Sequence, residues 1–436
     1  MDTLHVVVVG SGPVGMTTAL LLARQGNRIT LVDRDPGPLP GRPWQRVGVM
    51  QFLLPNTLRA LGRNVLLERL PDLDRALQDA GAELRTQRGA PDFLQDMHVR
   101  RSVMERAMWE HTSREPGVRR LTGHVDDVVV EDDRAVGVLL DGAFVAADTV
   151  VDASGRAGRI GHEHRPPVEG GDSGFAYASR LFRLRPGGEP GPVNGGPGFV
   201  SEHRGFLQLV FHHDAGTFSV LFVRAASDRA LAALRHEDSF MAAAAAVPGA
   251  AQWTEPDRAQ PVDVVRAGAN LANHYRPQPT RVTGLVAVGD AASTTNPAGA
   301  RGLSLGFRTA AALADIAAVS GPDSWAAALE EWSRAQLRPW WADHVLTDAW
   351  QVAAWQGDEP DADGPVPSGL VLAAVPEHPE WRGLAGPFLG MAVGPEALDP
   401  LREEVRAMLR AGWRPRPPVT TSREDLLSAI APAVSA

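Results

Sequence analysis

The chain has 436 residues, of which 44% are hydrophobic and 22% are charged, and it carries a formal net charge of −9. This length predicts two or three domains, and this composition excludes a disordered, collagen-like or coiled-coil protein. The absence of cysteine excludes disulfides, thiolate catalysis, iron–sulfur clusters and cysteine zinc sites. The absence of lysine excludes Schiff-base chemistry and a P-loop lysine.

Charge and hydropathy along the chain bear on partners and location. There is no run of basic residues of the kind that grips a phosphate backbone, and no apolar run of the ~18 to 20 residues that a membrane span needs. The sequence passes from Met1 directly into an apolar strand without a basic leader. We therefore expect a cytoplasmic protein with no nucleic-acid partner and no membrane span.

The first motif lies at the amino terminus. Residues 4–9 are apolar and β-branched, which predicts a buried strand, and residues 16–25 are typical of an apolar helix. Between them a G-x-G-x-x-G turn would bring the backbone and a helix N-terminus close to a pyrophosphate. The candidate binding residues in this turn are Gly10, Gly12, Pro13, Val14 and Gly15.

An acidic residue follows at the expected position. Residues 28–32 predict the next strand, which ends at Asp33, where a carboxylate can accept hydrogen bonds from a ribose diol. Because Asp33 would repel a ribose 2′-phosphate, the site suits FAD or NAD better than NADP.

A second strand, loop and helix lie far downstream. Residues 285–288 predict a buried strand that runs into Gly289 and Asp290, and a long helix follows from about residue 304 to 318. Asp290 would bind a polyol chain, and the helix N-terminus near Gly302 would face a developing anion. NAD does not require this second element.

These two motifs resemble those of the FAD-dependent monooxygenases of the aromatic-hydroxylase (p-hydroxybenzoate hydroxylase-like) fold, which include the styrene- and indole-monooxygenase types. The resemblance covers roughly residues 4–340. It implies that the first motif holds the ADP half of FAD. The ribityl chain and the flavin ring would be held by Gly289, Asp290, Pro297, Gly302 and Leu303.

Two arginines also resemble family positions. Arg46 resembles an arginine that contacts the FAD phosphates, with Arg42 as the alternative, and Arg101 resembles the start of a family helix that faces the cofactor. A guanidinium fork suits pyrophosphate oxygens. Arg34 and Val125 complete the expected FAD-binding set.

The chain departs from the family at three positions. Asp152-Ala153-Ser154-Gly155 replaces an Asp-Gly motif linked to FAD and NADPH contacts, Ser293 replaces a histidine, and Ala300 replaces a loop glycine. NAD(P)H would therefore be a direct or an indirect electron source. The altered Asp152 motif favours delivery of reduced FAD by a separate flavin reductase.

The predicted fold class is α/β, with three regions. A Rossmann-like FAD-binding domain with a parallel sheet comprises residues 1–75, 96–165 and 280–321. An inserted antiparallel β-sheet domain for the substrate comprises residues 76–95 and 166–279, with strands at 175–185, 206–212, 217–223 and 260–266 and a helix at 227–247. Residues 322–436 form a helical region, with a loose tail from about Pro415.

Six tryptophans in the carboxy-terminal region follow one another at roughly helical spacing, which favours packing against the FAD domain. They are Trp325, Trp332, Trp340, Trp341, Trp350 and Trp355.

The resemblance implies a monooxygenase that transfers one oxygen atom from O₂ through a flavin C4a-hydroperoxide. The substrate would be a small organic molecule, aromatic or alkene and of the natural-product type, that is hydroxylated or epoxidised. The few basic groups that can be assigned to the pocket favour a neutral or aromatic molecule. Candidate pocket residues are Gln51, Tyr177, Phe211 and His213. Of His212 and His213, which point to opposite faces of their strand, we expect one to be solvated and one to lie in the core.

Several alternatives compete with this function. A geranylgeranyl-reductase-like saturase also carries Asp-Ala-x-Gly, and a flavin-binding module without catalysis is a third possibility. A flavin-dependent halogenase shares the fold, but that family relies on a lysine and a W-x-W-x-I-P segment, both missing here. No motif for metal ligands is present, so no metal is expected.

Overall fold

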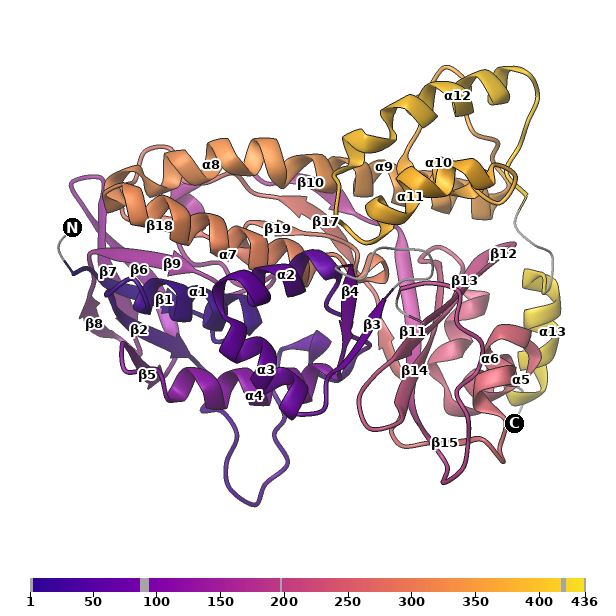
Figure 1. The fold of residues 1–436 in the computed structure, drawn as a ribbon, viewed down its shortest axis with the longest axis horizontal. Helices are drawn as coiled ribbons and strands as arrows, with labels where there is room; N and C mark the ends of the chain where they lie inside the picture. The colour runs from indigo at the N-terminus through magenta and orange to yellow at the C-terminus, as the bar shows by residue number, and fades with distance from the viewer. Residues whose placement is uncertain (1–2, 87–93, 197, 417–420, 435–436) are drawn as a thin grey trace.

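The computed structural model describes residues 3–86, 94–196, 198–416 and 421–434. One part of the molecule is built on a five-stranded parallel sheet (Figure 1). In spatial order the strands are β18 (Leu285–Ala287), β9 (Thr149–Asp152), β1 (His5–Val9), β2 (Arg28–Asp33) and β5 (Val118–Thr122). The carboxyl ends of β1, β2 and β18 therefore meet at one edge.

Alternate residues of β1 enter two different cores. Val6 and Val8 pack with helices on one face, whereas Val7 and Val9 pack against a three-stranded antiparallel sheet on the other. That small sheet consists of β6 (Val125–Glu131), β7 (Arg134–Leu140) and β8 (Ala143–Ala146). The helices are α1 (Pro13–Ala23), α2 (Ala60–Arg69), α3 (Pro71–Asp79), α4 (Arg101–Ser113), α7 (Gly302–Val319) and α8 (Trp325–Gln336). Burial on both faces explains why the four residues of β1 after His5 are all valine.

Helix α7 is, among the described helices, the one that is long and apolar enough to cross a bilayer. Ten of its 18 residues are buried inside the protein, where it packs against α1, α2 and α8. Its apolar composition is thereby explained by its place in the core.

The second large sheet is antiparallel and six-stranded, in the order β12 (Gly198–His203), β13 (Phe206–His212), β14 (Thr217–Ala225), β11 (Phe175–Leu184) and β15 (Ala259–Pro261), with β16 (Arg266–Gly268) also on β11. Two smaller sheets connect it to the first: β10 (Glu169–Asp172), β17 (Ala272–Tyr275) and β19 (Ser293–Thr294); and β3 (Glu83–Thr86) with β4 (Gln95–His98). Residues 87–93 of the predicted segment 76–95 lie outside the described residues.

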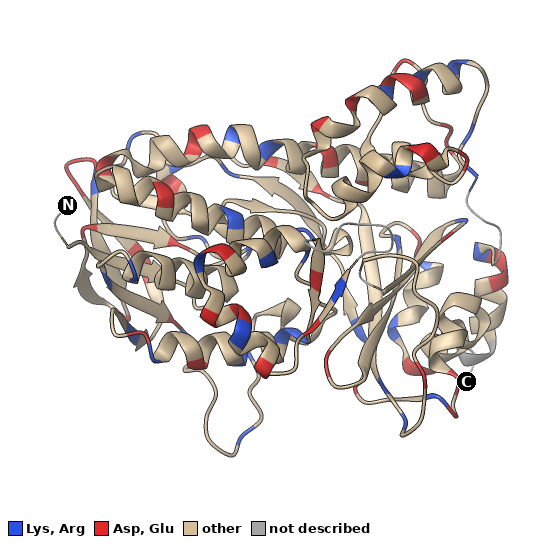
Figure 2. Ribbon diagram, in the orientation of Figure 1, with Lys and Arg blue, Asp and Glu red and all other residues tan. Residues whose placement is uncertain are grey.

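One face of the antiparallel sheet is covered by α5 (Glu237–Ala246), α6 (Pro248–Thr254) and α13 (Arg423–Val434). The carboxy-terminal region adds α9 (Arg338–Gln356), α10 (Ser368–Ala374), α11 (Arg382–Leu389) and α12 (Asp399–Arg410). Short 3₁₀ helices are η1 (Met50–Leu53), η2 (His162–His164), η3 (Ala230–Arg235), η4 (Gly289–Ala291), η5 (Pro297–Gly299), η6 (Pro322–Ser324), η7 (Pro379–Trp381) and η8 (Pro395–Leu398). The predicted α/β fold class, with a parallel sheet, an antiparallel sheet and a carboxy-terminal helical region, is confirmed. Residues of both charge signs are interspersed along the elements (Figure 2).

The prediction of a loose tail is wrong for residues 423–434. They form α13, whose Leu426 and Ile430 are buried against α5, and Arg423 is paired with Asp228 (2.5 Å). Leu426 and Ile430 are four residues apart and share one helix face, which was the available signal.

Three other predicted elements differ in detail. The helix expected at 227–247 is divided into η3 and α5, and α6 follows to Thr254. The strand expected at 260–266 is two short strands, β15 and β16, and β12 was not predicted. The tryptophans divide among three hydrophobic cores. Trp325 and Trp332 pack in the FAD-domain core, and the carboxy-terminal core contains Trp332, Trp340, Trp341 and Trp350. Trp355 packs on Phe175 of the antiparallel sheet, with 5.1 Å between the ring centroids.

Candidate active site

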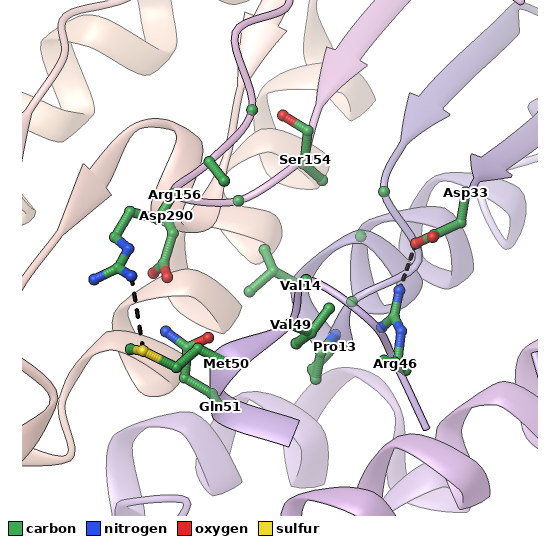
Figure 3. A pocket seen from close by; sticks show the side chains of 18 of the residues that line it. Pro13, Val14, Asp33, Arg46, Val49, Met50, Gln51, Ser154, Arg156 and Asp290 are labelled. Atoms are coloured by element: carbon green, nitrogen blue, oxygen red, sulfur yellow. Dashed lines mark hydrogen bonds and ion pairs between the residues drawn. The ribbon is translucent and has the colours of Figure 1, made fainter. Parts of the chain in front are cut away.

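A cavity of about 550 Å³ connects the ends of two strands of the parallel sheet. Asp33, at the end of β2, lies at one end of it, and Asp290, just after β18, lies toward the other (Figure 3). Most of the residues predicted from sequence line it: Gly10, Gly12, Pro13, Val14, Gly15, Asp33, Arg34, Arg46, Gln51, Arg101, Val125, Asp290, Pro297, Gly302 and Leu303. Both predicted motifs therefore face one space.

The glycine turn provides close approach to this cavity. Gly10 has a φ of +105°, and a Cβ there would lie 2.4 Å from the Ala153 carbonyl oxygen. A Cβ at Gly15 would lie 1.9 Å from the Gly10 carbonyl oxygen, so neither position has room for a side chain. A Cβ at Gly12 would meet no atom within 4 Å, because Gly12 borders the open cavity. Helix α1 begins here without a side-chain cap, so its first N–H groups are available to an anionic group.

Asp33 is held by several donors. Its Oδ2 accepts hydrogen bonds from the Ser11 amide (2.7 Å), the Ser11 hydroxyl (2.9 Å) and Arg46 Nη2 (2.6 Å). Burial alone would raise the pKa of Asp33, but the charge of Arg46 and the hydrogen bonds from Asp35 and Ser11 outweigh it and hold the pKa below its usual range. The carboxylate is therefore ionised and fixed in position.

The sequence did not reveal Glu105, which joins the two predicted arginines. Its carboxylate is fully buried and accepts hydrogen bonds from Arg46 Nη1 (2.7 Å) and Arg101 Nε (2.5 Å). Asp33, Arg46, Glu105 and Arg101 thus form a chain of alternating charges along the cavity wall. The spacing of four residues between Arg101 and Glu105 was a signal for one link, but the link to Arg46 depends on the fold. Arg42 is exposed and does not line the cavity.

At the opposite end, Asp290 faces the cavity without a hydrogen-bond donor to its carboxylate among the described residues. Burial raises the pKa of Asp290, although the positive charges of Arg101 and Arg156 oppose the rise. Gly302, the first residue of α7, lies close by, since its Cβ would be 3.7 Å from Asp290 Oδ1. Gly289 does not line the cavity; it takes φ +63° and packs on Val14.

The Pro297 loop is held from behind by buried polar side chains that the sequence did not reveal. Asn273 donates to Asp348 Oδ2 (2.7 Å) and accepts from the Asn296 amide (2.7 Å), and the Asn296 side chain accepts from the Ala298 amide (3.1 Å). Burial raises the pKa of Asp348 to about 7. Helix α9 is thereby tied to the loop that borders the cavity, in which Ala300 has a φ of +52°.

The four predicted pocket residues have different positions. Gln51 lines the cavity, whereas Tyr177, Phe211 and His213 do not. Tyr177 and Phe211 belong to what we term the sheet-face cluster: Leu54, Phe175, Tyr177, Leu209, Phe211, Leu221, Val223 and Leu271, with Met50, Val200, Leu207, Ala298, Ala300, Val352 and Trp355 packed against them. Because Met50 and Ala300 also line the cavity, this cluster adjoins it.

His213 is buried and bonds through Nε2 to the Ser219 hydroxyl (2.9 Å). Burial lowers the pKa of His213 to about 3, so its ring is neutral at pH 7. The expectation that one of His212 and His213 is solvated is wrong, because His212 is buried as well and packs on Trp253 (4.7 Å between ring centroids). The reason is that helix α6 covers the outer face of the sheet.

FAD fits this cavity. The space beside Gly12 and the free amides of α1 suit a pyrophosphate, ionised Asp33 suits a ribose diol, and Asp290 with the start of α7 suits the ribityl chain and ring. Among the described residues there is no group of three or more His, Asp or Glu side chains able to hold a metal ion.

Comparisons with known proteins agree with this geometry. Residues 5–176 match the FAD dependent oxidoreductase family. A kynurenine 3-monooxygenase of Salinispora tropica is 31% identical over 169 residues, which are 35% of this chain and 36% of the relative. A second kynurenine 3-monooxygenase, from Salinispora arenicola, is 29% identical over 170 residues. The matched segment thus spans about a third of these relatives.

Solved structures resemble the whole fold. The flavin-dependent brominase Bmp2 matches with a TM-score of 0.67 at 16% identity, covering 93% of this chain and 100% of the brominase. PqsL, a probable FAD-dependent monooxygenase from Pseudomonas aeruginosa, matches with a TM-score of 0.62 at 15% identity, covering 82% of this chain and 99% of PqsL. The amino-terminal segment is therefore similar to the FAD dependent oxidoreductases, whose cofactor fits the cavity, and the chain shares its fold with the brominase and with PqsL.

Proposed function

We propose that this protein is an FAD-dependent monooxygenase that inserts one oxygen atom from O₂ into a small aromatic or alkene substrate. The observation that carries the proposal is the single cavity bounded by both aspartate motifs, with an apolar cluster adjoining its Asp290 end. That arrangement suits a cofactor whose reactive ring must lie beside an organic molecule and away from water. The kynurenine 3-monooxygenase relatives support an aromatic substrate.

The residues divide the work of binding. The glycine turn and α1 would hold the pyrophosphate, Asp33 the ribose, and Asp290 the ribityl chain. Bound FAD, once reduced, would supply the oxygen-transfer chemistry with O₂. The amino terminus of α7, at Gly302 and Leu303, would stabilise negative charge on the ring through its N–H groups.

The sheet-face cluster would exclude water from the substrate. Phe211 is 2% exposed and Tyr177 is 5% exposed, and Ala298 and Ala300 of the Pro297 loop pack against the cluster to which both belong. Gln51 lines the same end of the cavity and is the polar side chain best placed to orient a substrate. An apolar wall beside few polar groups is typical of small-molecule sites.

For the electrons, we favour reduced FAD delivered by a separate flavin reductase that oxidises NAD(P)H in the cytoplasm. The Asp152 carboxylate is buried, and its Oδ1 accepts hydrogen bonds from the Ser154 amide (3.0 Å) and hydroxyl (2.5 Å). Its Oδ2 makes no hydrogen bond among the described residues and lies 3.9 Å from Arg165 Nη1. Because Asp152 does not line the cavity, we infer that its carboxylate is not offered to a nicotinamide nucleotide there. Rapid NAD(P)H oxidation by the purified holoenzyme alone, stimulated by substrate, would refute this route.

Two other flavin activities are less well supported. Halogenation is suggested by the similar fold of the brominase. However, the flavin-dependent halogenase family considered above relies on an active-site lysine, and this chain has no lysine. A saturase of the geranylgeranyl-reductase type would transfer hydride and leave no oxygen in its product. A halogenase would add a halogen and a saturase would add hydrogen, whereas the proposed reaction adds an oxygen atom to the substrate.

The first experiment tests the cofactor. Protein reconstituted with FAD should stay yellow after desalting, and Asp33→Asn and Asp290→Asn should each weaken FAD binding. The second supplies reduced FAD, ¹⁸O₂ and L-kynurenine or related aromatic amines, and measures label in the product by mass spectrometry. Retention of FAD together with incorporation of ¹⁸O supports the proposal. A reduced, unlabelled product supports the saturase, and loss of FAD on desalting refutes the assignment.

A further inference from the structure

The Pro297 loop, residues 295–301, has two sides. Thr295, Pro297 and Ala300 line the cavity. Asn296 is buried, does not line the cavity, and is hydrogen-bonded on the side away from it. What lies behind the loop therefore fixes the position of the side that borders the cavity.

One stripe of helix α9 runs behind this loop. Trp340, His344 and Asp348 are spaced four residues apart, so they share one face of the helix, and all three are buried. A Cβ at Gly299 would lie 2.8 Å from His344 Cε1, so the ring packs directly on this glycine. The Arg301 guanidinium lies 5.1 Å from the Trp340 ring centroid, and its Nη1 is 3.4 Å from His344 Nδ1. Helix α9 thus contacts the end of the loop directly.

Asp348 reaches the start of the loop through Asn273 of β17. The Asn273 Nδ2 donates to Asp348 Oδ2 (2.7 Å), and the Asn273 Oδ1 accepts from the Asn296 amide (2.7 Å). The Asn296 Oδ1 in turn accepts from the Ala298 amide (3.1 Å). Because Asn273 and Asn296 are both buried, loss of one partner would leave a polar group unpaired in the interior.

Between these two attachments the backbone takes a conformation that alanine does not favour. Ala300 has a φ of +52°, in the left-handed region where the Cβ of an L-residue is crowded. Such a residue persists where the surrounding structure holds it in place. Asn296 on one side and Arg301 on the other are the held positions, so the shape of the loop depends on α9 as well as on its own sequence.

We propose that Asp348 and Asn273 are positioning residues for the cofactor, because they hold the Pro297 loop and the first turn of α7 where both border the cavity. Neither side chain lines the cavity, so both act through the loop. This inference rests on the proposed function in taking FAD as the occupant. A helix of the carboxy-terminal region thereby sets how tightly FAD is bound and, through the N–H groups at the start of α7, how strongly negative charge on the ring is stabilised.

The test titrates the FAD-free protein with FAD, followed by flavin fluorescence, and then measures the reduction potential of the bound flavin. Asp348→Ala and Asn273→Ala should each weaken FAD binding by about tenfold, which is within the usual range of coupling between two sites. Each should also shift the reduction potential to more negative values, because the α7 amides are held less firmly. Asp348→Asn keeps an acceptor for Asn273, so it should retain most of the affinity and the wild-type potential.

Asp74→Ala is the matched control for a general loss of stability. Asp74 is also buried and pairs with an arginine, Arg63 (3.4 Å), but it lies on α3 and does not line the cavity. It should lower the free energy of unfolding and leave the FAD affinity and the reduction potential unchanged.

The role of the loop itself is tested in the Ala300→Gly background. Glycine has no preference against the left-handed region, so the loop needs less support from α9. The loss of FAD affinity caused by Asn273→Ala should therefore be severalfold smaller in this background. The same loss in both backgrounds would show that Asn273 does not act through the loop, and would overturn the inference.

Hydrogen exchange of the wild type keeps the test decisive where a substitution prevents folding. Coupling between two sites is reciprocal, so FAD should slow amide exchange in α9 as well as in the loop, and should not slow it in α13. Failure of the wild type to bind FAD refutes the proposed function and the inference with it. If the wild type binds FAD, three results overturn the inference alone: unchanged affinity in Asp348→Ala, an equal loss in Asp74→Ala, or unchanged exchange in α9.

Discussion

Glu105→Gln tests whether the buried charge chain stabilises the FAD domain. The Glu105 side chain is 0% exposed, and its two oxygens accept from Arg46 (2.7 Å) and Arg101 (2.5 Å). A glutamine keeps one acceptor and turns an N–H₂ donor toward the other guanidinium, leaving a buried positive charge without its partner. Breaking a buried ion pair in this way costs about 3–5 kcal/mol. Because Arg46 keeps its pairing with Asp33, we expect the lower end, about 3 kcal/mol.

The assay is urea unfolding of the FAD-free protein, followed by tryptophan fluorescence; Trp109 lies on the same helix, α4. Glu403→Gln is the matched control, since Glu403 also pairs with an arginine (2.5 Å) but its side chain is 76% exposed. An exposed pair contributes little, so the control should change the free energy of unfolding by less than about 0.5 kcal/mol. Equal effects of the two substitutions would refute the reasoning, because burial would then not decide the value of the charge chain.

Three further predictions concern the glycine turn, the loop support and the carboxy terminus. Gly15→Ala should destabilise the FAD-free protein, because the added Cβ would lie 1.9 Å from the Gly10 carbonyl oxygen. Gly12→Ala should leave the stability of the FAD-free protein unchanged, because a Cβ there meets no atom within 4 Å. It should weaken only FAD binding, measured by flavin fluorescence titration. Burial raises the pKa of Asp348 from 3.8 to about 7, so the folded protein binds more protons than the unfolded chain in this window. Stability should fall by up to about 4 kcal/mol between pH 4 and 8, and Asp348→Asn should flatten that profile in urea melts. Leu426→Ala should lower stability by about 2–5 kcal/mol while Ser428→Ala, on the exposed side of α13, should not; similar melts for both would contradict the docking of α13.

The local parts of the site could be predicted from the sequence. The G-x-G-x-x-G turn and the aspartates at 33 and 290 follow from adjacent residues, because a strand, a tight turn and a helix start are set by short-range backbone geometry. The parallel sheet was predictable because residues 6–9 and 285–288 are the continuous apolar runs that are typical of strands buried on both faces. The prediction that both motifs hold one cofactor is supported by the shared cavity.

Other predictions depended on covering elements that are distant in sequence. One of His212 and His213 was expected to be solvated, because adjacent residues of a strand point to opposite faces of the sheet. This alternation does not reveal what packs on each face. Helix α6 covers the outer face, so His212 is buried as well. The tail likewise folds as α13 only because α5 offers an apolar partner.

The sequence by itself predicted the cofactor class and the two motifs that would hold it, because each motif is a short segment of strand, turn and helix. Only the tertiary structure decided which polar side chains meet: Glu105 with Arg46, and Asp348 with Asn273. The members of these pairs are 20 or more residues apart in the printed sequence. Their attraction is short-ranged, so it operates only after sheet and helix packing has closed the intervening chain.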